Sequence, residues 1–146
     1  MMRFVVLFMF LLLGFSTPST GATRQDIICL AKNIYFEANN QSYIGQQAVA
    51  WVTLNRVYSG DYPNNLCDVV FQYKQFSWTI DGKHRVPRSV KKFSVALAAA
   101  IHVYSNYGRI QDPTKGATMY HTVYITPYWH YDYTPTVIIG DHIFLK

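Results

Sequence analysis

Apolar residues recur with a helical period between residues 26 and 106. This period predicts helices over residues 26–38, 42–57, 64–71 and 89–106, separated by polar or turn-forming residues. In the first helix, one face carries Ile27, Leu30, Ala31, Ile34 and Ala38. We expect the segment Asn39-Asn40-Gln41 to end the helix, because asparagine tolerates the left-handed conformation in which helices often finish. In the last helix, the positions expected to face inward are Val90, Phe93, Leu97, Ala100, Ile101 and Tyr104.

The last third of the chain follows a different pattern. Residues 117–124 and 136–145 are rich in Thr, Tyr, Val and Ile and show little helical period, so they predict strands. The pair Gly140-Asp141 predicts a turn within the second of these segments. Helices followed by a small antiparallel sheet are the order of an α+β fold. No repeat or linker divides the chain, which favours one domain.

The first 22 residues have the layout of a secretory signal. Arg3 gives a positive start, residues 4–15 are apolar and uncharged, and small residues lead to Ala22. The apolar run is shorter than the roughly 20 residues that a membrane-spanning helix needs. We therefore predict a signal peptide over residues 1–22, a single domain over residues 23–146, and a secreted or cell-envelope location. An uncleaved signal-anchor remains the alternative, because Thr20 stands two residues before Ala22, where alanine is favoured.

Charge and cysteine content fit an exported domain. The formal net charge of +5 falls to +4 without residues 1–22, which carry only Arg3. A basic exported protein suits an anionic envelope, although such a charge also merely keeps a small domain soluble. Lys and Arg form no cluster of nucleic-acid-binding character, and we expect no nucleic-acid partner. Cys29 and Cys67 predict one disulfide, with two buried free thiols as the alternative.

Glu37 is the only glutamate in the chain and stands in the last turn of the first predicted helix. The negative end of a helix disfavours a carboxylate, and the apolar and aromatic neighbours of Glu37 disfavour ionisation further. Both effects raise the pKa of Glu37, as a general acid working near neutral pH requires. An ordinary surface glutamate is the alternative, and the apolar stretch around Glu37 argues against it.

Other candidate groups give weaker signals. The seven aspartates lie mostly at predicted caps and turns, where Asp has structural roles. No Cys/His zinc spacing occurs, and His121, His130 and His142 are scattered through the strand region. We expect no cofactor, with a metal site at these histidines as the alternative.

Several ordered blocks of sequence resemble one known family. The first block, residues 31–38, contains the motif Tyr35-Phe36-Glu37-Ala38, and the others fall within residues 45–50, 54–57, 62–64, 75–78, 116–121, 127–129 and 139–144. Several blocks in the same order are more specific than any single motif. Together they resemble the SleB-type cell wall hydrolases, the spore cortex-lytic family, over nearly all of residues 25–146.

The resemblance implies a lysozyme-like cell wall hydrolase domain over residues 23–146 with Glu37 as the catalytic acid. It implies a lytic transglycosylase that cleaves the bond between N-acetylmuramic acid and N-acetylglucosamine in peptidoglycan and forms a 1,6-anhydro sugar. The residues expected to bind substrate are Gln41, Gln75, Ser77, Trp78, Tyr120 and His121. One departure stands next to the motif, because the family continues Glu-Ala-Arg-Gly-Glu and this chain has Gln41 in place of the second acid.

Two alternative functions remain open at this point. One is a zinc-dependent N-acetylmuramoyl amidase, and the other is a murein-binding paralogue with weakened catalysis, for which Gln41 is the argument. Hydrolysis by water in place of transglycosylation also remains open. In each case we expect glycan strands of peptidoglycan as partner, membrane contact only through the signal segment, and a monomer.

Overall fold

A computed structural model of the protein describes residues 23–81 and 85–146. The predicted signal segment lies outside these residues. Within the two described stretches, no helix combines the length and the apolar character needed to cross a membrane.

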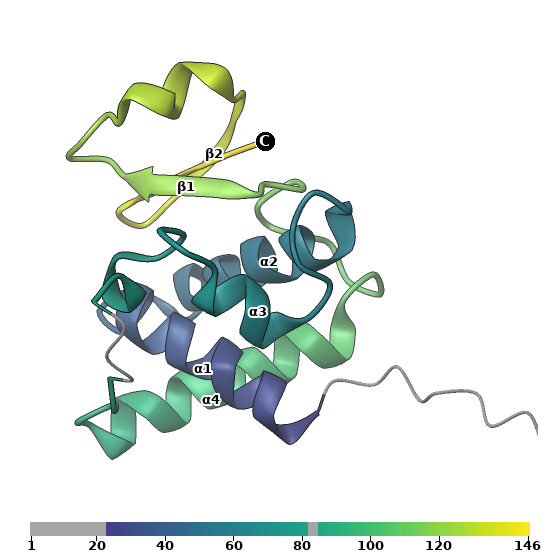
Figure 1. The fold of residues 1–146 in the computed structure, drawn as a ribbon, viewed down its shortest axis with the longest axis vertical. Coiled ribbons are helices and arrows are strands. Elements are labelled where there is room, and N and C mark those ends of the chain that lie inside the picture. Colours follow the sequence, from purple (N-terminus) through teal and green to yellow (C-terminus); the bar gives the residue numbers. More distant parts are fainter. Residues whose placement is uncertain (1–22, 82–84) are drawn as a thin grey trace, which may run out of the picture.

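In the described residues, four α-helices form the lower layer in Figure 1: α1 (Arg24–Ala38), α2 (Tyr43–Ser59), α3 (Leu66–Phe71) and α4 (Val90–Asn106). The four helices predicted from the apolar period are confirmed. Helix α1 packs against each of the other three and places Leu30 and Ile34 in the core. Each helix begins at a side chain that accepts a hydrogen bond from a backbone N–H of the first turn, at Thr23, Ser42, Asn65 and Ser89.

Helix α1 ends where predicted, but not in the predicted conformation. Asn39 keeps a right-handed backbone with φ −66°, so the expectation of a left-handed residue was wrong there. Instead, Nδ2 of Asn39 donates to the carbonyl oxygen of Tyr35 at 2.6 Å. An amide donor therefore satisfies one of the carbonyl groups that a helix end leaves free. This contact fixes the last turn of α1, which carries Glu37.

The inner face of α4 agrees with the predicted one at Ala100, Phe93, Leu97 and Tyr104 but not at Val90 and Ile101. Its buried residues are Ala96, Ala99, Ala100 and Val103, whereas Val90 and Ile101 are 85% and 49% exposed. Phe93, Leu97 and Tyr104 pack at the edge of the core. Small side chains face α1 and α2 because they let the helix backbones approach closely, and the larger apolar residues cover the rim.

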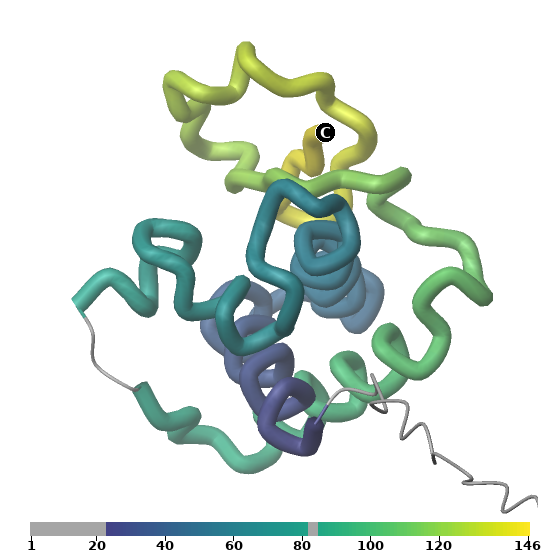
Figure 2. The backbone as a smooth tube through the Cα atoms, turned by 45° about the vertical axis from the view of Figure 1, so that its right-hand side comes forward, coloured from purple at the N-terminus to yellow at the C-terminus, as the bar shows by residue number. Residues whose placement is uncertain are grey.

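The described part of the C-terminal region forms a three-stranded antiparallel sheet in the order β1-β3-β2, at the top of Figure 1. Its strands are β1 (Met119–Thr122), β2 (Pro135–Ile139) and β3 (His142–Leu145). The predicted turn joins β2 to β3 at Gly140, whose φ of +57° favours glycine. Phe144 of β3 packs on Ala48 and Val52 of α2, and Figure 2 shows this meeting of sheet and helix. The predicted α+β class is confirmed.

Two short 3₁₀ helices complete the described structure. The helix η1 (Ser77–Thr79) lies between α3 and α4, and η2 (Tyr128–Asp132) lies between β1 and β2. No pattern in the sequence predicts η2. A disulfide joins Cys29 of α1 to Cys67 of α3, so that prediction is confirmed.

Candidate active site

Glu37 lines a pocket where the helical layer meets the sheet. The pocket has a volume of about 370 Å³. It is lined by Glu37, Arg56, Lys74, Gln75, Phe76, Ser77, Met119, Tyr120, Tyr128 and Trp129. These residues come from the ends of α1 and α2, the start of η1 and the segment before it, strand β1 and helix η2, so both layers contribute to one site. We call it the Glu37 pocket.

The carboxyl group of Glu37 is partly buried and is held by one direct hydrogen bond. The hydroxyl of Tyr120 donates to Oε2 of Glu37 at 2.9 Å. Burial raises the pKa of Glu37, while the hydrogen bond from Tyr120 and the positive charge of Arg56 offset part of the rise. A carboxyl group with a raised pKa keeps its proton closer to neutral pH, which is the property that a general acid needs.

Tyr120 is a partly buried and uncharged donor. Burial and the neighbouring charge of Glu37 raise its pKa well above the usual value for tyrosine. Its ring packs against His142 and Phe144 of β3, with centroid distances of 5.2 and 5.7 Å. Because β3 holds the ring, Tyr120 can hold Glu37 in one orientation.

Arg56 lies in the last turn of α2, where the negative end of the helix favours a cation. The guanidinium lies over the rings of Tyr62 and Phe76, 5.3 and 5.1 Å from their centroids. Its Nε donates to the carbonyl oxygen of Thr118 at 2.6 Å. Helix α2 and the segment before β1 are joined by this contact at the pocket floor.

Of the predicted site residues, Glu37, Gln75, Ser77 and Tyr120 line the Glu37 pocket. Trp78 lies outside the lining and is only 4% exposed. Its Nε1 donates to Oδ1 of Asn33 at 3.0 Å, and its ring stacks on Phe36. Trp78 therefore supports the turn of α1 that carries Glu37.

Gln41 also lies outside the lining of the pocket. Its Nε2 donates to Oδ2 of Asp141 at 2.9 Å, and its Oε1 accepts from the backbone N–H of Asp141 at 3.1 Å. A Cβ at Gly140 would lie 2.3 Å from the same Oε1, so glycine is required there for this contact. Gln41 thus links the α1–α2 turn to the β2–β3 turn.

His121 pairs with His130 on η2, with 2.7 Å between Nε2 of His121 and Nδ1 of His130. Within residues 23–81 and 85–146, no group of three or more His, Cys, Asp or Glu side chains could hold a metal ion. The pair connects strand β1 to η2, the element that brings Tyr128 and Trp129 to the pocket.

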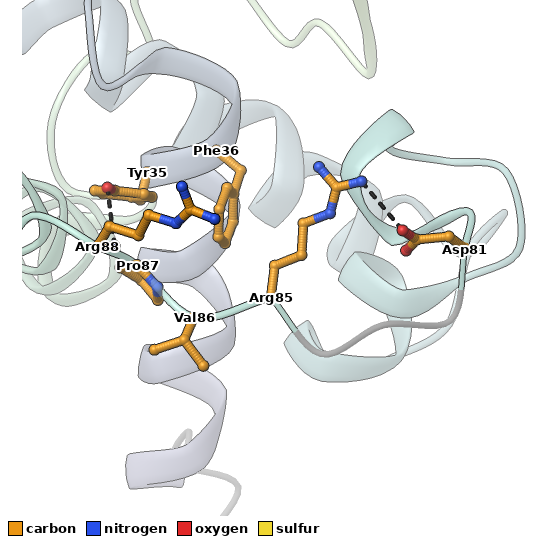
Figure 3. A pocket seen from close by; sticks show the side chains of 7 residues that line it. All are labelled: Tyr35, Phe36, Asp81, Arg85, Val86, Pro87 and Arg88. Carbon is orange, nitrogen blue, oxygen red and sulfur yellow. Dashed lines mark hydrogen bonds and ion pairs between the residues drawn. The ribbon is translucent and has the colours of Figure 1, made fainter.

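A second hollow, of about 760 Å³, lies beside α1 and the start of α4 (Figure 3). Arg88 lies beside Phe36, and Arg85 points toward Asp81, its ion-pair partner at 3.2 Å. Asp81 is the only carboxyl group among the described residues that line this hollow. The larger hollow therefore lacks a carboxyl group suited to acid catalysis, which the smaller one has.

Residues 40–145 match the sequence profile of a family described as Cell Wall Hydrolase. The chain belongs to the Cell Wall Hydrolase family. The profile match covers nine of the ten pocket-lining residues and begins after Glu37, the tenth.

Relatives in this family are named spore cortex-lytic enzymes. The one from Bacillus cereus is 33% identical over 91% of this chain and 48% of its own length. The one from Bacillus subtilis is 30% identical over 86% of this chain and 39% of its own length. The chain thus spans about half the length, or less, of these relatives.

Two solved structures of Cell Wall Hydrolase relatives share the fold. The catalytic domain of the Bacillus cereus SleB protein is 32% identical with a TM-score of 0.69, over 87% of this chain and 94% of that one. The catalytic domain of the germination-specific lytic transglycosylase SleB from Bacillus anthracis gives the same identity and TM-score, over 87% and 98% of the two chains. The resemblance seen in the sequence is confirmed at the level of family and fold.

Sequence reasoning about this Cell Wall Hydrolase did not single out several pocket residues. Arg56, Met119 and Lys74 received no role, and Tyr128 and Trp129 appeared only within a family block. Arg56, Tyr128 and Trp129 do fall inside the family blocks at 54–57 and 127–129. The family blocks therefore pointed to these residues, but they do not show which side chains line the same pocket as Glu37.

Proposed function

We propose that this Cell Wall Hydrolase cleaves the glycan strands of peptidoglycan as a lytic transglycosylase, with Glu37 as acid and then as base. The observation that carries the proposal is the partly buried carboxyl of Glu37, with a raised pKa, in a pocket shared by helices and sheet. The similarity to SleB from Bacillus anthracis, which is named a lytic transglycosylase, supports the same chemistry.

In the first step, Glu37 gives its proton to the glycosidic oxygen between N-acetylmuramic acid and N-acetylglucosamine. Oε2 accepts the hydrogen bond from Tyr120, while Oε1 has no hydrogen-bond partner among the described residues. Oε1 is therefore the oxygen that carries the proton to the substrate. As the bond from the anomeric carbon to this oxygen breaks, the leaving sugar keeps the proton as its hydroxyl, and Glu37 becomes a carboxylate.

In the second step, the carboxylate of Glu37 takes the proton from the muramyl 6-hydroxyl as that oxygen bonds to the anomeric carbon. The product is a 1,6-anhydro sugar, and Glu37 is protonated again. Glu37 is the only carboxyl group among the described residues that line the pocket. Paired-acid glycosidases need a second carboxyl group close to the first, so a single one favours this intramolecular route.

Substrate contacts follow from the lining of the pocket. Gln75 and Ser77 offer polar groups for sugar hydroxyls, and the rings of Tyr128 and Trp129 offer faces for sugar stacking. We assign supporting roles to Gln41, Trp78 and His121, which lie outside the lining. We further propose that residues 1–22 direct export and are removed after Ala22, which N-terminal sequencing of the secreted protein tests.

Digestion of purified peptidoglycan by the wild type and by Glu37→Gln tests the central claim. We expect anhydro-muropeptides, lighter by one water than hydrolytic products, from the wild type and none from Glu37→Gln. Asp61→Asn, which removes an exposed carboxyl group, is the matched control and should keep full activity. Thermal unfolding checks that both variants fold.

Other products would overturn parts of the proposal. Reducing-end muropeptides from the wild type would indicate hydrolysis by water. Release of stem peptides would indicate an amidase, and binding to sacculi without soluble products would indicate a binding protein. Full activity of a folded Glu37→Gln would remove Glu37 from the chemistry.

A further inference from the structure

Arg56 is a buried cation with no anion in direct contact among the described residues. The side chain is only 3% exposed. Nε donates to Thr118, and Nη2 lies 3.6 Å from the sulfur of Met119. Nη1 is buried and has no hydrogen-bond partner among the described residues. One donor of a charged group is therefore left unsatisfied in a residue that lines the Glu37 pocket.

The neighbours of Arg56 offset its burial only in part. Burying a charge without a partner is strongly unfavourable. The structure supplies the negative end of α2, one carbonyl oxygen and the faces of Tyr62 and Phe76. Each of these groups is neutral overall. A negative charge at Nη1 is what the site lacks.

Glu37 is the acidic group that can supply this charge. It lines the same pocket as Arg56, and the charges of the two residues act on one another. Protonated Glu37 offers Arg56 no negative charge, whereas ionised Glu37 does.

We propose that Arg56 is the counter-ion of ionised Glu37. When Glu37 has given its proton to the substrate, Tyr120 holds Oε2 of the carboxylate and Nη1 of Arg56 supplies the balancing charge. The inference rests on the proposed function, since it concerns the same carboxyl group. Arg56 acts through Glu37 and is a positioning residue that touches no reacting atom.

In this arrangement, different effects stabilise the two protonation states of Glu37. Burial stabilises the protonated form before the proton is donated, and Arg56 stabilises the carboxylate afterwards. Glu37 must act first as acid and then as base, so both its protonated and its ionised form must be accessible in free energy. Neither burial nor Arg56 alone achieves this.

Other titratable groups also lie around the pair. The phenols of Tyr62, Tyr120 and Tyr133 act on Arg56, and burial raises the pKa of Tyr120 well above its usual value. Burial lowers the pKa of His142, which packs against Tyr120, and so disfavours its charged form. Glu37 is the only carboxyl group among the described residues that act on Arg56.

The single glutamate makes this inference directly measurable. With glutamate labelled with ¹³C at the side-chain carboxyl, one titrating glutamate signal reports the pKa of Glu37 without any substrate. We expect Arg56→Met to raise the pKa of Glu37 by about one pH unit or more, a typical effect of losing an opposite charge nearby. Arg56→Lys, which keeps the charge, should raise it less. Lys74→Met, the control for loss of a charge at the exposed rim, should change it little.

A second measurement leaves Arg56 unchanged, in case Arg56→Met does not fold. The N–H of Arg56 Nε donates to Thr118. In the wild type, its ¹⁵N signal should shift with pH, with a midpoint at the pKa of Glu37. In Glu37→Gln it should not shift over the same pH range. An Arg56 signal that does not respond to the ionisation of Glu37, or an unchanged pKa of Glu37 in a folded Arg56→Met, would overturn the proposal.

Kinetics give a readout that a purely structural role would not affect. The general acid must be protonated, so activity is lost as pH rises through the pKa of Glu37. We expect the alkaline limb of the kcat/KM profile to move to higher pH in Arg56→Met and to stay closer to the wild-type position in Arg56→Lys. The NMR measurements need no turnover. A failure of the counter-ion proposal can therefore be distinguished from a failure of the proposed function, which the digestion with Glu37→Gln tests.

Discussion

Glu37 receives its hydrogen bond from a residue 83 positions later in the chain. Tyr120 donates to one carboxyl oxygen, and the other has no hydrogen-bond partner among the described residues. In the proposed mechanism this asymmetry matters because a proton donor needs one free oxygen in a fixed place. Strand β3 packs against Tyr120, so in that mechanism the sheet contributes by orienting Glu37.

The raised pKa of Glu37 predicts a pH-dependent loss of stability. The fold favours the protonated form, so its contribution is complete below the ordinary value of 4.5 and is lost as pH rises through the raised pKa. Glu37→Gln does not titrate. We expect the wild type to lose stability relative to Glu37→Gln above pH 4.5, by about 1.4 kcal/mol for each pH unit of pKa rise.

Urea unfolding of the two proteins at a series of pH values measures this difference. Asp61→Asn again serves as control and should follow the wild type at every pH. A stability difference between Glu37→Gln and the wild type that stays constant from pH 4 to pH 8 would contradict a raised pKa.

Glu37 could be found from the sequence because its signals are local. It is the only glutamate, at the end of an apolar helix and inside a family block. Arg56 could not be assigned a role in the same way. Its burial depends on Tyr62, Phe76 and Thr118, and no helical period shows that these residues converge on it.

At the scale of elements, the α1–α2 turn is tied to the β2–β3 turn by Gln41 and Asp141. In the sequence, Gln41 stands where the family has a second acid, which left a weakened catalysis open as an alternative. In the structure, a glutamate at position 41 would place a carboxylate against that of Asp141, whose pKa the hydrogen bond from Gln41 lowers. The partner lies 100 residues away, which is why position 41 could not be interpreted from its neighbours.

We therefore expect Gln41→Glu to lower the thermal unfolding midpoint at neutral pH by a few degrees. It should not increase muralytic activity, because residue 41 does not line the pocket. Adding Asp141→Asn to Gln41→Glu removes the like charge and should restore the midpoint. Differential scanning calorimetry of the single and double variants measures both effects. Equal midpoints for Gln41→Glu and the wild type would show that the contact contributes little.

The elements themselves were more predictable than their faces. The four helices and the broken second strand segment follow from local periodicity and turn residues. The inner face of α4 does not follow from local periodicity. The alanines that pack against α1 and α2 are less hydrophobic than Val90 and Ile101, which are exposed. Helix η2 has no apolar period, since its sequence is Tyr-Trp-His-Tyr-Asp.

For the whole molecule, the decisive feature is where the two layers meet. Phe144 fixes the sheet on α2, and the Glu37 pocket opens at this junction. Local patterns predict both layers but not their docking, because the contacts between them join residues far apart in the chain. This explains why the site was predicted only in part.

The disulfide acts on the whole molecule because it closes a 38-residue loop between α1 and α3. In the chain-entropy description, such a loop stabilises the folded state by roughly 4 kcal/mol, or on the order of 10–20 °C in unfolding midpoint. We expect that loss in Cys29→Ala/Cys67→Ala, with activity kept at low temperature because neither cysteine lines the pocket. Reduced wild type should have the same unfolding midpoint as the double variant. If the double variant instead keeps the midpoint of the oxidised wild type, the packing of α1 on α3 alone holds the loop. A stabilising contribution of this size would favour folding in an oxidising compartment, which agrees with the export predicted from residues 1–22.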